Sequence, residues 1–139
     1  SISRDYLINY CRSFIYTTAL PAYSVAHIQS AYNFLSENLQ RIQELHYNVG
    51  LFKTLVLENS IEGFIVSDSP IQSCIISGNK NVNFVASFIQ KEGFDVRPIL
   101  YPTVAKSKER IRICLHAYNT DDEITQLVHT LKVGLSKLL

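Results

Sequence analysis

Apolar residues recur on one helical face through about 35 residues of the N-terminal half, and this pattern limits the chain to folds with long packed helices. The spacings alternate between three and four residues, as in an amphipathic helix. After a shift of one residue the pattern resumes, and this shift predicts a bend or break near Gln40 or Gly50. Helices packed on a larger partner explain the pattern better than a coiled coil does. The face comprises Val25, Ile28, Tyr32, Leu35, Leu39 and Ile42, followed by Leu45, Val49, Phe52 and Val56.

The residues before this face predict a second, shorter helical segment. We expect a helix over about residues 3–11, with Asp5 in its favourable first turn. Residues 13–21 are rich in β-branched and aromatic side chains and should interrupt the helical pattern. Pro21 then suits a position near the start of the next helix.

The second half of the chain alternates between strand and helix patterns. We expect strands over residues 71–77, 95–101 and 110–115, and helices after residues 78 and 120. Pro98 has no amide hydrogen, so its strand should lie at an edge or contain a bulge. Thr120 and Glu123 form a capping box at the start of the last helix. The order is β-α-β-β-α, which gives an α+β fold with helices on one face of a small sheet.

Charge and composition argue against several classes of partner. A formal net charge of +1 gives no reason to expect nucleic acid or an anionic membrane. No apolar run approaches the roughly 18 residues that span a bilayer. The cysteines and histidines lack the spacing of metal ligands, so we expect no metal site. Cys11, Cys74 and Cys114 each have apolar neighbours, and we interpret them as buried free thiols of a cytoplasmic protein.

The residues alone offer no complete catalytic constellation. Nucleotide-binding glycine motifs are absent, and none of the seven lysines has the apolar surroundings of a Schiff-base lysine. Arg112 is the one residue that suggests chemistry, because it lies between Ile111 and Ile113 in an expected strand. It is either an exposed or ion-paired residue of the open sheet face, or a clamp that holds a carboxylate with its planar guanidinium. The pattern leaves both interpretations open.

Three groups of motifs, in order along the whole chain, resemble the α-oxoamine synthases. The segment from Phe14 to Pro21 is similar to their F-I-[FY]-[ST]-T-[AS]-[LM]-P motif. Ser69-Pro70-Ile71-Gln72 with Gly78-Asn79 is similar to the strand that opens their C-terminal domain. Tyr101-Pro102-Thr103-Val104, Glu109 to Ile113 and Thr120 to Ile124 resemble their last signature. Each motif is weak by itself, and together they are specific.

The resemblance implies a fold-type I pyridoxal-phosphate enzyme that works as a homodimer. Such acyltransferases condense an amino acid with an acyl thioester and release carbon dioxide, and the cofactor acts as the electron sink. The resemblance also implies that the lysine carrying the cofactor lies before Ser1 in a longer parent. We therefore expect residues 1–139 to be one C-terminal domain, mostly helical over 1–60 and β-α-β-β-α over 61–139. By itself it should bind no cofactor and have no activity.

Site residues follow from the positions that match the family motifs. Arg112 matches the arginine that binds the carboxylate of the amino-acid substrate, and Thr103 matches a threonine that contributes to substrate binding. Thr17 and Thr18 match a pair that reaches the cofactor phosphate of the opposite subunit. A role in shaping their turn is a nearly equal alternative for these two threonines.

Departures from the motifs bear on the branch of the family. Ser69-Pro70-Ile71-Gln72 and Pro102-Thr103-Val104 favour the branch that serves biotin synthesis. Tyr101-Pro102 resembles the 2-amino-3-ketobutyrate ligases instead, and Asn119 stands where a histidine is common. An alternative of another class is a stand-alone module that binds a small molecule.

Overall fold

A computed structural model of the chain describes residues 1–16 and 18–138, which form two compact units. The first unit is Ser1–Asn38 and the second is Leu39–Leu139. The expectation that residues 1–139 act as one domain stays a prediction.

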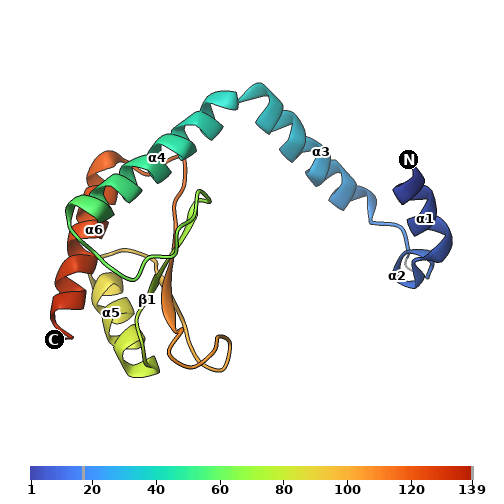
Figure 1. Ribbon diagram of the computed structural model, residues 1–139. Coiled ribbons are helices and arrows are strands. Elements are labelled where there is room, and N and C mark those ends of the chain that lie inside the picture. Colours follow the sequence, from blue (N-terminus) through green and yellow to red (C-terminus); the bar gives the residue numbers. More distant parts are fainter. Residues whose placement is uncertain (17, 139) are drawn as a thin grey trace. The chain divides into compact units, whose positions relative to one another are not determined.

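The first unit contains three helices and, among its described residues, no strand. They are α1 (Ile2–Tyr10), α2 (Arg12–Ile15) and α3 (Ala22–Glu37) (Figure 1). The short first helix is confirmed, and Pro21 is the N-cap of α3. The expected interruption begins later than residue 13. The amides of Ile15 and Tyr16 donate hydrogen bonds to the carbonyls of Cys11 and Arg12, and these bonds close the single turn of α2.

The predicted break in the long helical pattern is confirmed near Gln40. Helix α3 is capped at Asn38, and α4 (Leu39–Glu58) begins at the next residue. Gly50 does not interrupt the backbone, since it lies inside α4. In the second half of the predicted apolar face Val49, Phe52 and Val56 are buried, whereas none of the described residues of α3 is buried.

The second unit has the expected β-α-β-β-α order after α4. Strands β1 (Ile71–Ile75), β2 (Arg97–Ile99) and β3 (Arg110–Cys114) alternate with α5 (Asn79–Lys91) and α6 (Asp121–Ser136). The sheet order is β1-β3-β2, with both pairs antiparallel. Strand β2 is therefore an edge strand, as Pro98 predicts. Helices α5 and α6 lie on one side of the sheet (Figure 1).

Strand β2 is shorter than residues 95–101 because its flanking amides bond elsewhere. The Val96 amide donates to the Phe94 carbonyl. The Tyr101 amide donates to Oδ1 of Asn79 at 3.0 Å, and the Asn79 amide group returns a bond to the Tyr101 carbonyl at 3.2 Å. Both ends of the expected strand are thus used to hold turns.

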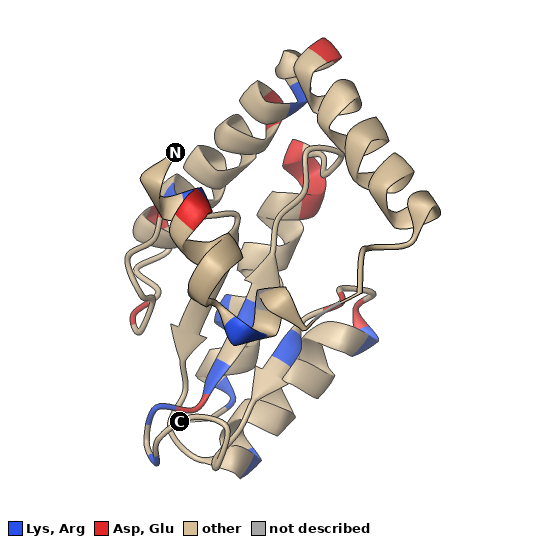
Figure 2. Cartoon of the chain, turned by 90° about the vertical axis from the view of Figure 1, so that its right-hand side faces the viewer, with Lys and Arg blue, Asp and Glu red and all other residues tan. Residues whose placement is uncertain are grey.

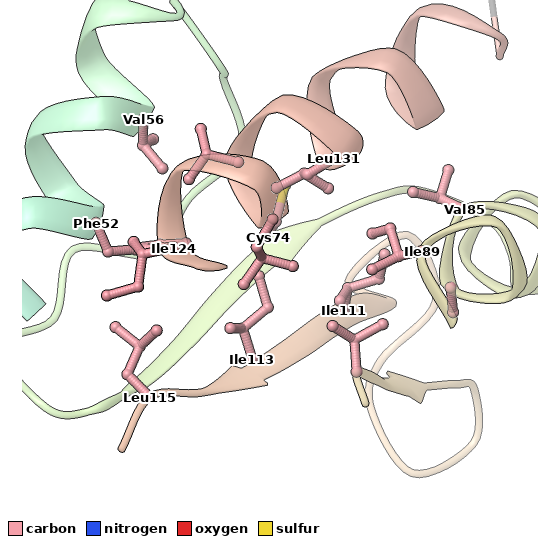
Figure 3. Packing of buried hydrophobic residues seen from close by; sticks show 14 of the residues in the cluster. Phe52, Val56, Cys74, Val85, Ile89, Ile111, Ile113, Leu115, Ile124 and Leu131 are labelled. Carbon is pink, nitrogen blue, oxygen red and sulfur yellow. The ribbon is translucent and has the colours of Figure 1, made fainter. Parts of the chain in front are cut away.

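One apolar core fills the space between the sheet and its helices (Figure 3). Ile111, Ile113 and Cys74 point from the strands towards Ile124 and Leu131 of α6 (Figure 3). All five are buried, with exposed fractions of 2% or less. Burying each of the isoleucine and leucine side chains contributes about 1.5–3 kcal/mol relative to exposure. This layer therefore fixes which face of the sheet remains open.

The three cysteines are free, but only Cys74 is buried. The prediction of buried thiols is wrong for Cys114, which is exposed, and Cys11 is only partly buried. Side chains of a strand alternate between faces, so the burial of Ile111 and Ile113 places Cys114 on the open face.

The N-cap of helix α5 is a glycine, and a carboxylate distant in the sequence binds its amide. Gly78 has φ of 92° and no side chain to satisfy the first amides. Its own amide donates to Oε2 of buried Glu109 at 3.1 Å. The hydrogen bond from Gly78, above other contributions, lowers the pKa of Glu109. A carboxylate is also favourable beside a helix N-terminus.

Candidate functional site

The open face of the sheet presents Arg112 to solvent. Its neighbours Ile111 and Ile113 are buried under the helices, so Arg112 points to the opposite side. The Arg112 side chain is exposed, so its guanidinium group is not desolvated although both neighbours in the sequence are apolar. Its register partners are Ser73 of β1 and Arg97 of β2. Arg112 therefore occupies the middle of the central strand, with a strand on each side.

A cavity of about 490 Å³ lies near the C-terminal end of β3, and Arg112 is among the residues that line it. Its lining also contains Arg97, Cys114, His116, Tyr118 and Glu123. The basic residues of the second unit include several on the strands themselves (Figure 2). Arg97 pairs with Asp95 at 3.1 Å. Within the described part of the chain, no acidic group lies within ion-pair distance of Arg112.

The rim of this cavity is held by the turn between β3 and α6. The rings of His116 and Tyr118 stack, with 4.8 Å between centroids and 13° between planes. The His116 amide donates to Oδ1 of Asn119 at 2.8 Å. Buried Asn48 of α4 donates to the carbonyls of both His116 and Asn119, each at 2.9 Å. The turn is thus tied to the helical layer, which limits its freedom to move.

The capping box of α6 completes the rim. The Glu123 carboxylate accepts a bond from the Thr120 amide at 3.0 Å, and the Glu123 amide donates to Oγ1 of Thr120 at 3.3 Å. The Thr120 amide, with help from Asn119, lowers the pKa of Glu123. The predicted capping box is confirmed. The Glu123 carboxylate already accepts hydrogen bonds from Thr120 and Asn119. Helix capping is therefore a sufficient reason for a carboxylate at this position near the arginines.

Thr103 lies apart from this cavity. It is exposed in the turn that follows β2, and it is not among the residues that line the cavity. The bonds between Asn79 and Tyr101 anchor the beginning of its turn to α5. The structure therefore does not bring Thr103 and Arg112 into one pocket within this unit. The substrate role of both residues stays a prediction.

The proposed phosphate contacts belong to the first unit. Thr18 is exposed in the non-helical segment before α3. Thr17 lies outside the described residues. The match of both threonines to a cofactor-binding pair stays a prediction.

Arg97, His116 and Tyr118 were not predicted as site residues. Arg97 lies beside Arg112 through the pairing of β2 with β3, and the register of this pairing depends on the geometry of the connection between the strands as well as on their own pattern. The alternation of side chains in this edge strand could have identified Arg97. Pro98 lies on the core side, so Arg97 and Ile99 lie on the open face. His116 and Tyr118 flank a turn whose closure depends on Asn48, 68 residues away from His116.

Comparison with known proteins places the chain in a family. The model of the aminotransferase class I and II family matches residues 2–131. The chain belongs to this family. It is 40% identical to 8-amino-7-oxononanoate synthase of Emericella nidulans over 98% of this chain and 34% of that protein. The same enzyme of Vibrio parahaemolyticus is 30% identical, over 96% and 34% respectively. The chain thus spans about a third of the length of these relatives.

Solved structures support the same assignment. The 8-amino-7-oxononanoate synthase of Francisella tularensis matches with a TM-score of 0.81 and 25% identity, over 99% of this chain and 40% of that chain. A variant of serine palmitoyltransferase from S. paucimobilis, solved with a bound pyridoxal phosphate–myriocin aldimine, has a TM-score of 0.81 at 15% identity, over 96% of this chain and 34% of that chain. The latter shows likeness of fold alone. The resemblance to α-oxoamine synthases and the α+β fold class are confirmed.

The described residues do not by themselves fit pyridoxal phosphate. A lysine that binds this cofactor needs a secluded setting, and none of the seven lysines is buried. Six are exposed, and the half-buried Lys53 pairs with Asp68 at 2.6 Å. Across the described ranges, no cluster of three or more His, Cys, Asp or Glu is placed to hold a metal ion. No helix in the same ranges has the length and hydropathy of a membrane span.

Proposed function

We propose that the full-length protein containing this chain is an 8-amino-7-oxononanoate synthase of biotin synthesis. It condenses L-alanine with a pimeloyl thioester and releases carbon dioxide. The observation that carries the proposal is the exposed guanidinium of Arg112 in a cavity, at the position where the family motif has its carboxylate-binding arginine. Among the described residues no acidic group lies within ion-pair distance of it, although Asp95 and Glu123 also line the cavity. The names of the relatives from Emericella nidulans and Vibrio parahaemolyticus support this branch.

In this proposal Arg112 binds the carboxylate of the amino acid. A guanidinium offers two parallel N–H donors that match the two carboxylate oxygens. The buried residues on either side of Arg112 hold its backbone in the central strand, so its side chain starts from a fixed position on the open face. The chain's contribution is to bind and orient the substrate. Thr103 contributes a further substrate contact from its own turn.

The remainder of the full-length protein supplies the cofactor site. The chain covers about a third of its relatives and has no buried lysine among its described residues. We expect the isolated chain to be inactive and to form no covalent adduct with pyridoxal phosphate. In a cytoplasmic homodimer, Thr17 and Thr18 would approach the cofactor phosphate of the opposite subunit.

Substrate assays of the full-length protein test the proposal. Turnover of L-alanine with a pimeloyl thioester should exceed turnover of glycine with acetyl-CoA. The reverse preference would overturn it in favour of a 2-amino-3-ketobutyrate ligase, to which Tyr101-Pro102 is similar. A third outcome is that neither substrate pair is turned over, but a small molecule binds the isolated chain and shifts its thermal stability. That result would favour a stand-alone binding module.

Substitution of Arg112 tests its role separately. Arg112→Gln should raise the KM for L-alanine by about tenfold or more, because a charge-assisted hydrogen bond contributes about 1.5–3 kcal/mol. Arg110→Gln is the matched control, since Arg110 lies on the same strand and the same face but outside the cavity lining. An unchanged KM for Arg112→Gln would return this residue to a surface role.

A further inference from the structure

Two arginines face each other across the edge of the sheet. Arg97 of β2 is the register partner of Arg112 of β3, and both line the same cavity. Residues directly opposite in an antiparallel pair have Cβ atoms roughly 4.5–5.5 Å apart, where like charges destabilise the pairing. A cost of this kind is offset when each of the two guanidinium groups binds a carboxylate of the substrates.

The present partner of Arg97 can give way to such a ligand. Arg97 bonds to Asp95 at 3.1 Å, and their side chains are 62% and 73% exposed. An exposed pair of this kind contributes little to stability, about 0–1 kcal/mol. A ligand carboxylate can therefore replace Asp95 at little cost. The cavity of about 490 Å³ falls within the range of small-molecule sites.

The chemistry of the product explains why two cationic groups would be needed. The name 8-amino-7-oxononanoate describes a chain that still ends in a carboxylate. The carboxylate of the amino acid leaves as carbon dioxide, so the one that remains comes from the acyl donor. An enzyme that makes this product therefore encounters two carboxylates with different fates.

We propose that Arg97 is a specificity-determining residue that binds the far carboxylate of the acyl thioester. Arg112 holds the carboxylate that leaves, and Arg97 holds the one that stays. This inference rests on the proposed function. It predicts that the protein prefers acyl donors derived from dicarboxylic acids over equally long monocarboxylic ones.

A comparison of two acyl donors tests the proposal in the full-length protein. Pimeloyl and heptanoyl thioesters have the same chain length, and only the first has a terminal carboxylate. Arg97→Gln should raise the KM for the pimeloyl thioester by about tenfold, while the KM values for the heptanoyl thioester and L-alanine stay within twofold. Arg41→Gln is the matched control, because Arg41 also forms an exposed 3.1 Å pair, with Glu44, and lies outside the cavity.

A second variant removes the competing carboxylate and has the opposite expected effect. Asp95→Asn should lower the KM for the pimeloyl thioester severalfold without changing that for the heptanoyl thioester. A purely structural role of the Arg97–Asp95 pair predicts instead that both variants affect the two thioesters alike. That result would overturn the inference.

Binding measurements separate failure of this inference from failure of the proposed function. Pimelate, used as the probe without turnover, should bind the wild-type protein at least tenfold more tightly than heptanoate, and Arg97→Gln should abolish the difference. If wild type makes product from L-alanine and pimeloyl thioester but Arg97→Gln retains the preference for dicarboxylates, only the role of Arg97 is refuted. If wild type neither turns over the pimeloyl thioester nor distinguishes pimelate from heptanoate, both proposals are refuted.

Discussion

Two glycines inside helices provide a matched test of how packing modifies helix propensity. Gly50 lies within α4 and is exposed, and a Cβ added there would meet no atom within 4 Å. Gly134 lies within α6 and is buried, and its added Cβ would lie 3.1 Å from Cδ1 of Phe88 and 3.2 Å from Cγ1 of Val85. Replacing glycine by alanine in a helix interior contributes about 1 kcal/mol through propensity. Only Gly134 also incurs a steric cost.

The magnitudes give opposite signs for the two substitutions. Gly50→Ala should raise the free energy of unfolding by about 1 kcal/mol. For Gly134→Ala the same gain is set against about 1–3 kcal/mol for overpacking, because Val85 is fully buried and its branched side chain is stiff. We expect a net loss of about 1 kcal/mol.

Urea titrations of the purified chain, followed by circular dichroism, measure both effects. With a slope of about 2 kcal/mol per molar urea, Gly50→Ala should move the midpoint up by about 0.5 M. Gly134→Ala should move it down by a similar amount. Equal stabilisation by both variants would refute the packing argument, and destabilisation by Gly50→Ala would refute the assignment of a continuous, unstrained α4.

Three further predictions concern buried polar groups and thiols. The lowered pKa of Glu109 stabilises the fold above the ordinary pKa of a glutamate, and this contribution disappears as pH falls through the lowered value. Glu109→Gln should therefore flatten the acid limb of a stability–pH profile, and an unaltered limb would contradict the Gly78–Glu109 bond. Asn48→Ala leaves two backbone carbonyls without their donor and should cost about 1–3 kcal/mol in thermal or urea unfolding; a loss below that range would mean that water replaces the amide. Burial raises the pKa of Cys74 to about 11, so a thiol reagent at pH 8 should label exposed Cys114 first, with the order read by mass spectrometry.

Local patterns predicted the elements of the second unit because their causes are local. The capping box of Thr120 and Glu123 needs only four consecutive residues, and it is present as predicted. Pro98 predicted an edge strand because its missing amide hydrogen excludes a central position. Gly93, with φ of 94°, directly follows the C-cap of α5, a position that favours glycine for an equally local reason.

Features that depend on distant parts of the chain were not predicted. Glu109 looks like one more charged residue of a polar connection, and its burial follows only from the approach of Gly78 at the start of α5. The pairing of Arg97 with Arg112 requires the register of two strands. Cys114 was misjudged because its apolar neighbours lie on the other face of the strand.

The sheet order also has a consequence for synthesis of the chain. Strand β3 is central but is the last of the three to be made, and β1 and β2 do not pair with each other. During translation, β2 has no strand partner until residues 110–114 have left the ribosome, and until then β1 is paired only through the short bridge between Phe64 and Cys74. Unpaired strand edges favour aggregation, so the strand that carries Arg112 is also the one whose arrival protects the nascent sheet.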